Sequence, residues 1–133
     1  MAVVFIDFDH FKSVNDTHGH DVGDIVLKEF SARFRRHTRS IDLPCRYGGE
    51  EFLVIMPDTN MTRAYQVGER LRVAIAADAF PIQSGPGIHL TASVGIATLE
   101  YPDDTPEAVF RRADNALFAA KRRGRNRVAA NAA

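Results

Sequence analysis

The chain has 133 residues, 45% of them hydrophobic, and its 17 basic and 17 acidic side chains give a formal net charge of zero. This length and composition fit a single domain over residues 1–133 and leave no room for a second. A neutral chain lacks the attraction that sequence-independent nucleic-acid binding needs, so we expect no nucleic-acid partner. Any anion site must therefore be local.

Cysteine usage and hydropathy indicate the compartment. The single cysteine, Cys45, cannot close an intramolecular disulfide. No apolar run is long enough to span a membrane, and the N-terminus lacks the pattern of a signal peptide. We therefore expect a cytoplasmic protein with no direct membrane insertion.

The first third of the chain predicts a buried strand followed by helix. Residues 2–8, AVVFIDF, form a continuous apolar run that is typical of a strand covered on both faces. From residue 20 to about residue 37, apolar side chains recur at helical spacing, which predicts an amphipathic helix. We expect the arginines of this helix to be solvated: Arg33, Arg35 and Arg36.

A β-hairpin is predicted over residues 43–56. The strand-like runs LPCRY and EFLVIM are separated by Gly48 and Gly49, a turn signal. Glu50 and Glu51 follow the glycines directly, so the hairpin places two adjacent carboxylates at its tip.

The second half of the chain predicts a helix over residues 64–79, a half-buried strand over 88–97, and a helix that starts at Thr105 and Pro106 and ends before Gly124. Residues 126–130 predict a closing strand. The order β-α-α-β-β-α-β-α-β indicates an α/β chain of the α+β type, with a mixed central sheet and flanking helices.

Three acids point to a metal site. Alternation along an extended strand places Asp7 and Asp9 on one side, so Asp7 can face the hairpin tip. Asp7, Glu50 and Glu51 would then repel one another unless a hard cation such as Mg²⁺ neutralised them, an arrangement that metal-assisted phosphoryl chemistry uses. The alternative is that both glutamates are solvated turn residues and that Asp7 caps a strand end. The glycine pair favours the site because it lets backbone approach a ligand closely.

Three blocks carry a resemblance to a known family: IDFDHFKSVNDTHGHDVGD at 6–24, GGEEF at 48–52 and ADNALFAAKRRGRN at 113–126. On these blocks the chain resembles the GGDEF domains of bacterial diguanylate cyclases, in the GGEEF variant of the signature. The resemblance implies a fold related to nucleotidyl-cyclase and polymerase palm domains. It also implies that two GTP molecules, one held by each subunit of a homodimer, condense into cyclic diguanylate (c-di-GMP) with release of pyrophosphate.

The resemblance implies which residues hold the metal ion and which bind the guanine base. It implies that Mg²⁺ or Mn²⁺ is held by Asp7, the carbonyl of Phe8 and Glu50, and that Glu51 helps bind a second ion or activate the 3′-hydroxyl. Asn15 and Asp24 match the guanine-binding pair, whose amide and carboxylate suit the edge of that base. Without the resemblance, Asn15 is a turn former and Asp24 a first-turn helix acid.

The resemblance also implies which basic residues bind the triphosphate of GTP. Lys121 and Arg125 match the triphosphate ligands, and their spacing of four predicts that both lie on one face of the last helix. Lys12 and the backbone N–H groups around residues 10 and 11 complete this predicted cradle. A solvated KRRGR stretch is the alternative.

A product-binding site is also implied. RSID, from Arg39 to Asp42, resembles the family's inhibitory RxxD motif, and Arg70 matches a second arginine of that site. Arginine can stack on guanine or bind phosphate in a bidentate manner, and Asp42 can accept from guanine N–H groups. A solvated arginine pair is the alternative.

The chain departs from its family at one end. Family members usually carry a helix and a turn before the first strand, whereas this chain begins inside the strand, so we expect a domain truncated at its N-terminus, from a longer protein with an upstream sensor or receiver module. We expect this fragment alone to cyclise GTP slowly or not at all. A catalytically inactive GGDEF domain that binds c-di-GMP or GTP is the rival function. A structural dimerisation domain is weaker because it leaves the matched residues unexplained.

Overall fold

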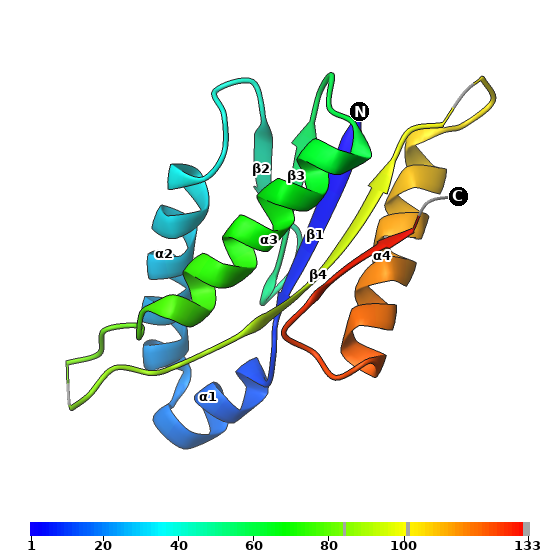
Figure 1. Cartoon of the computed structure of the whole chain (residues 1–133). Helices are drawn as coiled ribbons and strands as arrows, with labels where there is room; N and C mark the ends of the chain where they lie inside the picture. The colour runs from blue at the N-terminus through cyan, green and yellow to red at the C-terminus, as the bar shows by residue number, and fades with distance from the viewer. Residues whose placement is uncertain (84, 101, 132–133) are drawn as a thin grey trace.

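The computed structural model describes residues 1–83, 85–100 and 102–131. The elements follow the predicted order of strands and helices (Figure 1). They are β1 (Ala2–Phe8), α1 (Phe11–His18), α2 (His20–Arg36), β2 (Leu43–Arg46), β3 (Glu51–Met56), α3 (Met61–Ala77), β4 (Ala92–Thr98), α4 (Pro106–Arg122) and β5 (Val128–Asn131).

The strands form one mixed sheet in the order β2-β3-β1-β4-β5. β1 lies in the middle and pairs antiparallel with β3 and β4, β2 pairs antiparallel with β3, and β4 and β5 run parallel. Every residue of β1 is buried, as its continuous apolar run predicts. β2 is an exposed edge strand. Pro44 has no N–H to donate, which is tolerated at an edge because no further strand pairs with its outer side.

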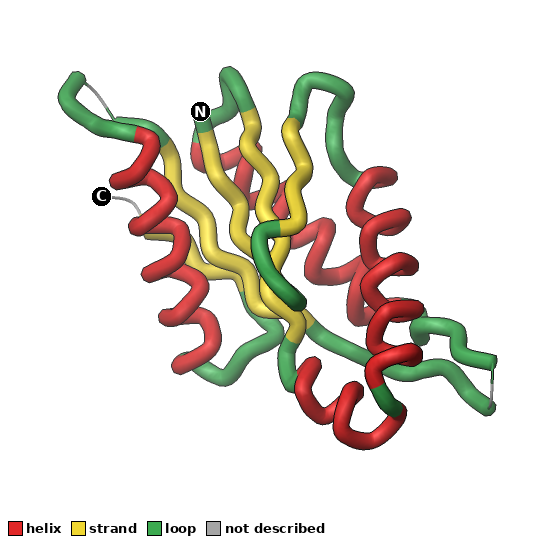
Figure 2. The backbone as a smooth tube through the Cα atoms, turned by 180° about the vertical axis from the view of Figure 1, so that it is seen from behind, coloured by secondary structure: helices red, strands yellow, loops and turns green. Residues whose placement is uncertain are grey.

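Helices cover both faces of the sheet (Figures 1 and 2). On one face, the even-numbered residues of β1 pack against α1, α2 and α3, and Phe8, Phe30 and Phe52 form edge-to-face ring pairs there. On the other face, Val3 and Phe5 pack against α4. No helix within the three described ranges is both long and apolar enough to cross a bilayer.

β4 differs from its prediction in extent and in burial. The strand begins at Ala92, four residues later than residue 88, where only an isolated bridge joins Ile88 to Phe80. The strand is buried on both faces rather than half-buried. The reason is Gly95: a Cβ there would lie 2.2 Å from the backbone nitrogen of Leu117 and 2.3 Å from the carbonyl oxygen of Ala113. Helix α4 therefore packs with its backbone directly on β4.

The prediction that Arg33 is solvated is wrong. Its side chain is buried and donates to the carbonyl oxygens of Asp78 at 2.9 Å and Ala79 at 3.0 Å, just beyond α3. Its guanidinium also lies 4.0 Å from the centre of the Phe80 ring. Arg33 thus satisfies backbone acceptors that the end of α3 leaves without partners. Arg35 and Arg36 are exposed, as expected.

One end of the sheet collects the segments that carry the predicted site. β1 ends where β3 begins, since Asp7 pairs with Glu51, and β4 begins beside Phe8. α4 runs back from the far end of β4 to the start of β5, so its C-terminal end lies at this same end (Figure 2). The topology therefore gathers the ends of β1 and α4 and the β2–β3 turn.

Candidate functional site

Two predicted acids face each other across neighbouring strands. Asp7, the second-last residue of β1, lies directly opposite Glu51, the first residue of β3. Residues opposite each other in a sheet share one face, with Cβ atoms about 5 Å apart. Asp7 therefore faces the hairpin, as predicted, while the half-buried Glu50 lies just outside the strand. Among the described residues, no group of three or more His, Cys, Asp or Glu side chains is arranged to hold a metal ion.

Lys121 contacts the acid pair from α4. Its ammonium group forms an ion pair with Oδ2 of Asp7. The other oxygen, Oδ1, is buried, and no donor in the described part of the chain reaches it. A buried carboxylate oxygen without a partner is costly, so the acid has coordination capacity that the protein itself does not use.

Both acids have perturbed acidities. Burial raises the pKa of Asp7, although the hydrogen bond and charge of Lys121 oppose this and Asp9 adds to it. Burial also raises the pKa of Glu51, followed by repulsion from Asp7, and Lys121 again opposes the shift. Burial is thus the main cause of both shifts, repulsion between neighbouring acids adds to it, and a cation beside the acids would oppose both effects.

Asp114 is a further acid near the site that the sequence did not bring to notice. Its charge contributes to the raised pKa of Glu51, and it is exposed on α4. Asp114 precedes Lys121 by seven residues, a spacing that places both on one side of a helix. That spacing is the sequence signal that could have found it.

Asp9 accepts hydrogen bonds from three groups of the protein itself. Its carboxylate accepts from Thr91 Oγ1 at 2.6 Å, from Ser93 Oγ at 2.7 Å and from the backbone N–H of Asn126 at 2.9 Å. Thr91 directly precedes β4, Ser93 is its second residue, and Asn126 lies in the loop after α4. Although alternation places Asp9 on the side of Asp7, its hydrogen bonds are used to hold these segments together.

The two glycines of the signature are not required by the fold. Neither Gly48 nor Gly49 has a positive φ. A Cβ on Gly48 would meet nothing closer than 4.0 Å, and a Cβ on Gly49 would meet nothing within 4 Å. Arg46 donates to the carbonyl oxygen of Gly49 at 2.8 Å and so closes the turn. Space is left beside this backbone for a ligand to approach.

The turn between β1 and α1 is strained. His10, the N-cap of α1, has a left-handed backbone with φ 58° and ψ 32°, which is uncommon for a residue other than glycine. The first N–H groups of a helix lack intrahelical partners. In α1 these N–H groups belong to the residues that follow His10. One of these residues is Lys12, whose side chain is exposed.

The predicted base-binding residues, Asn15 and Asp24, lie on the neighbouring helices α1 and α2. A Cβ on Gly23 would lie 2.0 Å from Oδ1 of Asn15, so the Asn15 amide packs directly over the backbone of α2. Asp24, the next residue, lines a cavity of about 300 Å³ together with Arg46 of β2. The close contact of Asn15 with Gly23 was not predicted. The sequence signal for it is a glycine inside a helical pattern.

The prediction that Lys121 and Arg125 share a helical face is wrong for Arg125. α4 ends at Arg122, and Gly124 with φ 125° reverses the chain, so that the N–H of Arg125 bonds to the carbonyl oxygen of Ala120 at 3.0 Å. Arg125 itself has φ 63° and lies exposed in the loop that Asp9 holds through the next residue. Its role toward phosphate stays a prediction.

The predicted inhibitory residues lie near the C-terminal end of α2. Arg39 donates from Nη2 to Asp42 at 2.9 Å and to Thr59 Oγ1 at 2.7 Å. The carboxylate of Asp42 is fully buried, whereas a third of the Arg39 side chain is exposed. Arg70 is exposed on α3, and its charge, after burial, lowers the pKa of His37.

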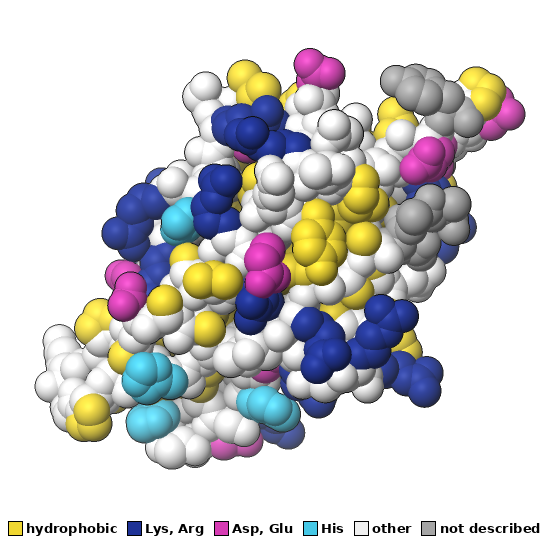
Figure 3. Space-filling view, in the orientation of Figure 1, with side chains coloured by type: hydrophobic (Ala, Val, Ile, Leu, Met, Phe, Trp, Pro, Cys, Tyr) yellow, Lys and Arg dark blue, Asp and Glu magenta, His cyan; other side chains and the backbone are white. Residues whose placement is uncertain are grey.

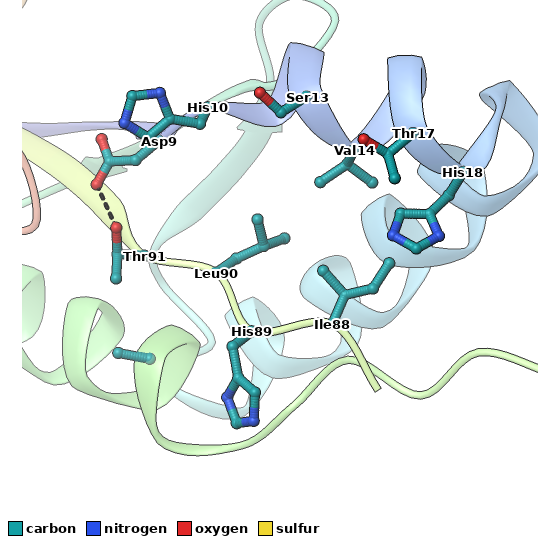
Figure 4. A pocket seen from close by; sticks show the side chains of 11 residues that line it. Asp9, His10, Ser13, Val14, Thr17, His18, Ile88, His89, Leu90 and Thr91 are labelled. Atoms are coloured by element: carbon teal, nitrogen blue, oxygen red, sulfur yellow. Dashed lines mark hydrogen bonds between the residues drawn. The ribbon is translucent and has the colours of Figure 1, made fainter. Parts of the chain in front are cut away.

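A separate cavity of about 400 Å³ opens between α1 and the segment that leads into β4 (Figure 4). Val14 and Leu90 point into it, and Asp9 and Thr91 are hydrogen-bonded at its edge. Its lining residues are Asp9, His10, Ser13, Val14, Thr17, His18, Ala76, Ile88, His89, Leu90 and Thr91. None of the side chains predicted to bind metal, base or phosphate lines this cavity.

Comparison with known proteins gives consistent results. The family model described as "Diguanylate cyclase, GGDEF domain" matches residues 1–127. The response regulator PleD of Caulobacter vibrioides is 46% identical over 134 aligned residues, which cover 100% of this chain and 30% of that protein. Other curated relatives are matched over 19% to 36% of their length, so the chain spans about a third of these proteins or less.

Two solved structures share the fold. The GGDEF domain of DgcB from Caulobacter crescentus, in complex with c-di-GMP, has a TM-score of 0.91 and 36% identity, covering 98% of this chain and 77% of that one. The active GGEEF domain of a diguanylate cyclase from Vibrio cholerae has a TM-score of 0.90 and 33% identity, covering 99% and 83%. The prediction from the three sequence blocks is confirmed: this chain belongs to the GGDEF domain family of diguanylate cyclases.

Proposed function

We propose that the chain is a catalytic domain that condenses two GTP molecules into c-di-GMP and releases pyrophosphate. The 3′-hydroxyl of each GTP attacks the α-phosphorus of the other in line, so that two phosphodiester bonds form, two pyrophosphates leave and each hydroxyl gives up its proton. The chain contributes mainly positioning and neutralisation of charge. The observation that carries the proposal is the acid pair Asp7–Glu51 beside Lys121, at the end of the sheet where the GGEEF turn lies. The active GGEEF domain among its structural relatives supports it.

Two features of the acid pair support a divalent cation there. Oδ1 of Asp7 is a buried acceptor that no donor within the described residues satisfies, and Glu51 lies opposite. Carboxylate and carbonyl oxygens are the ligands that Mg²⁺ and Mn²⁺ prefer. We propose Asp7, the carbonyl of Phe8 and Glu50 as ligands, with Glu51 close enough to assist. The ion would neutralise charge that develops on the phosphates.

The substrate phosphates are proposed to lie over the basic end of α4. Figure 3 shows Lys and Arg side chains gathered where α4 ends and the loop to β5 begins, although the chain as a whole is neutral. Lys121 and Arg125 belong to this end, and Lys12 with the backbone N–H groups around residues 10 and 11 is proposed to approach from the start of α1. Such a local field attracts a triphosphate without requiring a basic protein.

We propose that two copies of the chain act together. One domain offers a single set of base-binding residues, Asn15 and Asp24, whereas the product contains two guanines related by a twofold axis. In PleD, a response regulator, the matched region is 30% of the protein. An upstream sensor or receiver module that controls the encounter of two domains is therefore part of the proposal.

The test is an assay of GTP turnover with the chain fused to a dimeric coiled coil, with Mg²⁺ or with a chelator. We expect c-di-GMP and pyrophosphate with Mg²⁺ and neither with the chelator. Calorimetry under the same conditions measures nucleotide binding. Binding of c-di-GMP or GTP without pyrophosphate release would instead establish the rival function, a sensing module.

Gly23→Ala is expected to weaken GTP binding about tenfold, the order of one lost hydrogen bond. The new methyl group would lie 2.0 Å from Oδ1 of Asn15, which must swing away from the base it is proposed to bind. Isothermal titration calorimetry measures the affinity. Gly68→Ala is the control, since its methyl group would press only on Ile96 and Val94 in the core. Equal GTP affinity for wild type and Gly23→Ala would contradict the assignment of Asn15.

We propose that c-di-GMP binds at Arg39, Asp42 and Arg70 and inhibits turnover. Arg70→Ala tests this with little risk to the fold, because its side chain is exposed, whereas Arg39 stabilises the buried Asp42 carboxylate. We expect c-di-GMP affinity to fall about tenfold or more, as for a lost charge-assisted hydrogen bond, with an unchanged initial rate. The exposed Arg63, two turns earlier on α3, gives the control Arg63→Ala. Inhibition of wild-type strength in Arg70→Ala would remove Arg70 from the site.

A further inference from the structure

Lys121 contacts one of the two carboxylate oxygens of Asp7. Its Nζ pairs with Oδ2 of Asp7, and the two side chains are 33% and 6% exposed, so the ammonium closes a carboxylate that is otherwise buried. On the inner side, no donor from the described ranges reaches Oδ1. The carboxylate is thus half satisfied, and its single partner is the end of a flexible side chain.

The charges at this end of the sheet are not balanced by Lys121 alone. Its one positive charge faces two carboxylates, since Glu51 lies opposite Asp7. A divalent cation supplies twice the charge and accepts several oxygen ligands, whereas an ammonium group can only donate hydrogen bonds. An ammonium and a divalent cation on the same carboxylate oxygen would repel each other strongly. Because Oδ1 is buried, an ion that enters from solvent meets Asp7 at Oδ2, and its binding there requires Lys121 to leave.

A released Lys121 has a defined alternative. The side chain extends from the last turn of α4 on a four-carbon stem, and the neighbouring Arg122 belongs to the same basic end. A triphosphate bound over this end would bring oxygens that the freed ammonium can contact. The backbone of α4 need not move, because Gly95 already holds the helix against β4.

Building on the proposed function, we propose that Lys121 is a tethered counter-ion that occupies the metal position at Asp7 and exchanges with the divalent ion. In the resting site the ammonium competes with the ion for Asp7. When the ion enters, Lys121 is transferred from Asp7 to the substrate phosphates. Metal binding and triphosphate binding are thereby coupled through one side chain, in addition to any direct contact between ion and phosphate.

The test uses Mn²⁺ alone, titrated into the chain without nucleotide, with free Mn²⁺ measured by electron paramagnetic resonance. Lys121→Met keeps the length of the side chain and removes its charge. We expect it to bind Mn²⁺ about tenfold more tightly than wild type, the lower end of the effect of one adjacent charge on a carboxylate. Lys121→Arg keeps the competing charge and should match wild type. Arg111→Met should also match, since this exposed arginine of α4 makes no contact with Asp7.

A folded Lys121→Met variant that binds Mn²⁺ no more tightly than wild type overturns the exchange. If that variant does not fold, the wild-type chain decides the question through the NMR signal of the Lys121 ammonium during a Mg²⁺ titration. Exchange requires the signal to change as Mg²⁺ binds, and an unchanged signal overturns it. Neither readout involves turnover, so an exchanging chain that makes no c-di-GMP would refute only the proposed cyclase activity.

Discussion

Glu50→Gln is expected to lower the rate of c-di-GMP formation by about a hundredfold or more in the dimerised chain. The change keeps the shape of the side chain and removes the charge with which Glu50 is proposed to hold the ion. A catalytic metal contributes several kcal/mol to stabilising a transition state, and each 1.36 kcal/mol is tenfold in rate. Pyrophosphate release at saturating GTP and Mg²⁺ measures the effect.

The matched control for this variant is Glu107→Gln. Glu107 is an exposed acid in the first turn of α4, at the end of the helix opposite Lys121. Thermal unfolding of both variants should stay near that of wild type, because half-buried Glu50 forms no ion pair in the described part of the chain. Full activity in Glu50→Gln would mean that the metal is held elsewhere.

Gly95→Ala is expected to reduce the free energy of unfolding by about 3 kcal/mol, the upper range for overpacking a core. The added methyl carbon would lie 2.2 Å from the nitrogen of Leu117 and 2.3 Å from the oxygen of Ala113. Both are backbone atoms, which cannot rotate away as a side chain can, so α4 must shift on the sheet. Urea unfolding measures the change.

Gly49→Ala is the control for stability, since nothing lies within 4 Å of a Cβ there and we expect a change of at most about 0.5 kcal/mol. Because α4 positions Lys121 against Asp7, a folded Gly95→Ala variant should also lose nucleotide affinity. Stability within about 1 kcal/mol of wild type would show that α4 tolerates displacement from β4, contrary to the close backbone contact.

Local patterns predicted the strands and helices well because their physical cause is local. Thr105 and Pro106 mark the start of α4, where Thr105 Oγ1 accepts from the N–H of Ala108 at 3.2 Å. Gly124 marks its end with a left-handed φ. The same glycine excludes Arg125 from the helix, so the predicted Lys121–Arg125 face conflicts with the end signal in that very stretch. Weighing the two local rules against each other would have resolved this.

Long-range contacts explain what the sequence could not predict. Arg33 has the same local surroundings as its exposed neighbours, and only the arrival of the end of α3 buries it. Likewise, burial of β4 on both faces depends on α4 crossing Gly95. The pair of Asp7 and Lys121 joins residues 114 positions apart, and no periodicity encodes it. Facing of Asp7 and Glu51 was predictable, because a strand end and a hairpin tip have few ways to meet.

The buried carboxylate of Asp9 links a segment near the start of the chain to one near its end. Asp9 directly follows β1, and its carboxylate accepts hydrogen bonds from Thr91 and Ser93 around the start of β4 and from Asn126 before β5. Displacing the segment before β5 therefore breaks a bond to the segment after β1 and leaves a buried carboxylate with fewer donors. Fraying at the C-terminal strand is thus coupled to global unfolding, and the amide proton of Asn126 should exchange with solvent as slowly as those of the central strands.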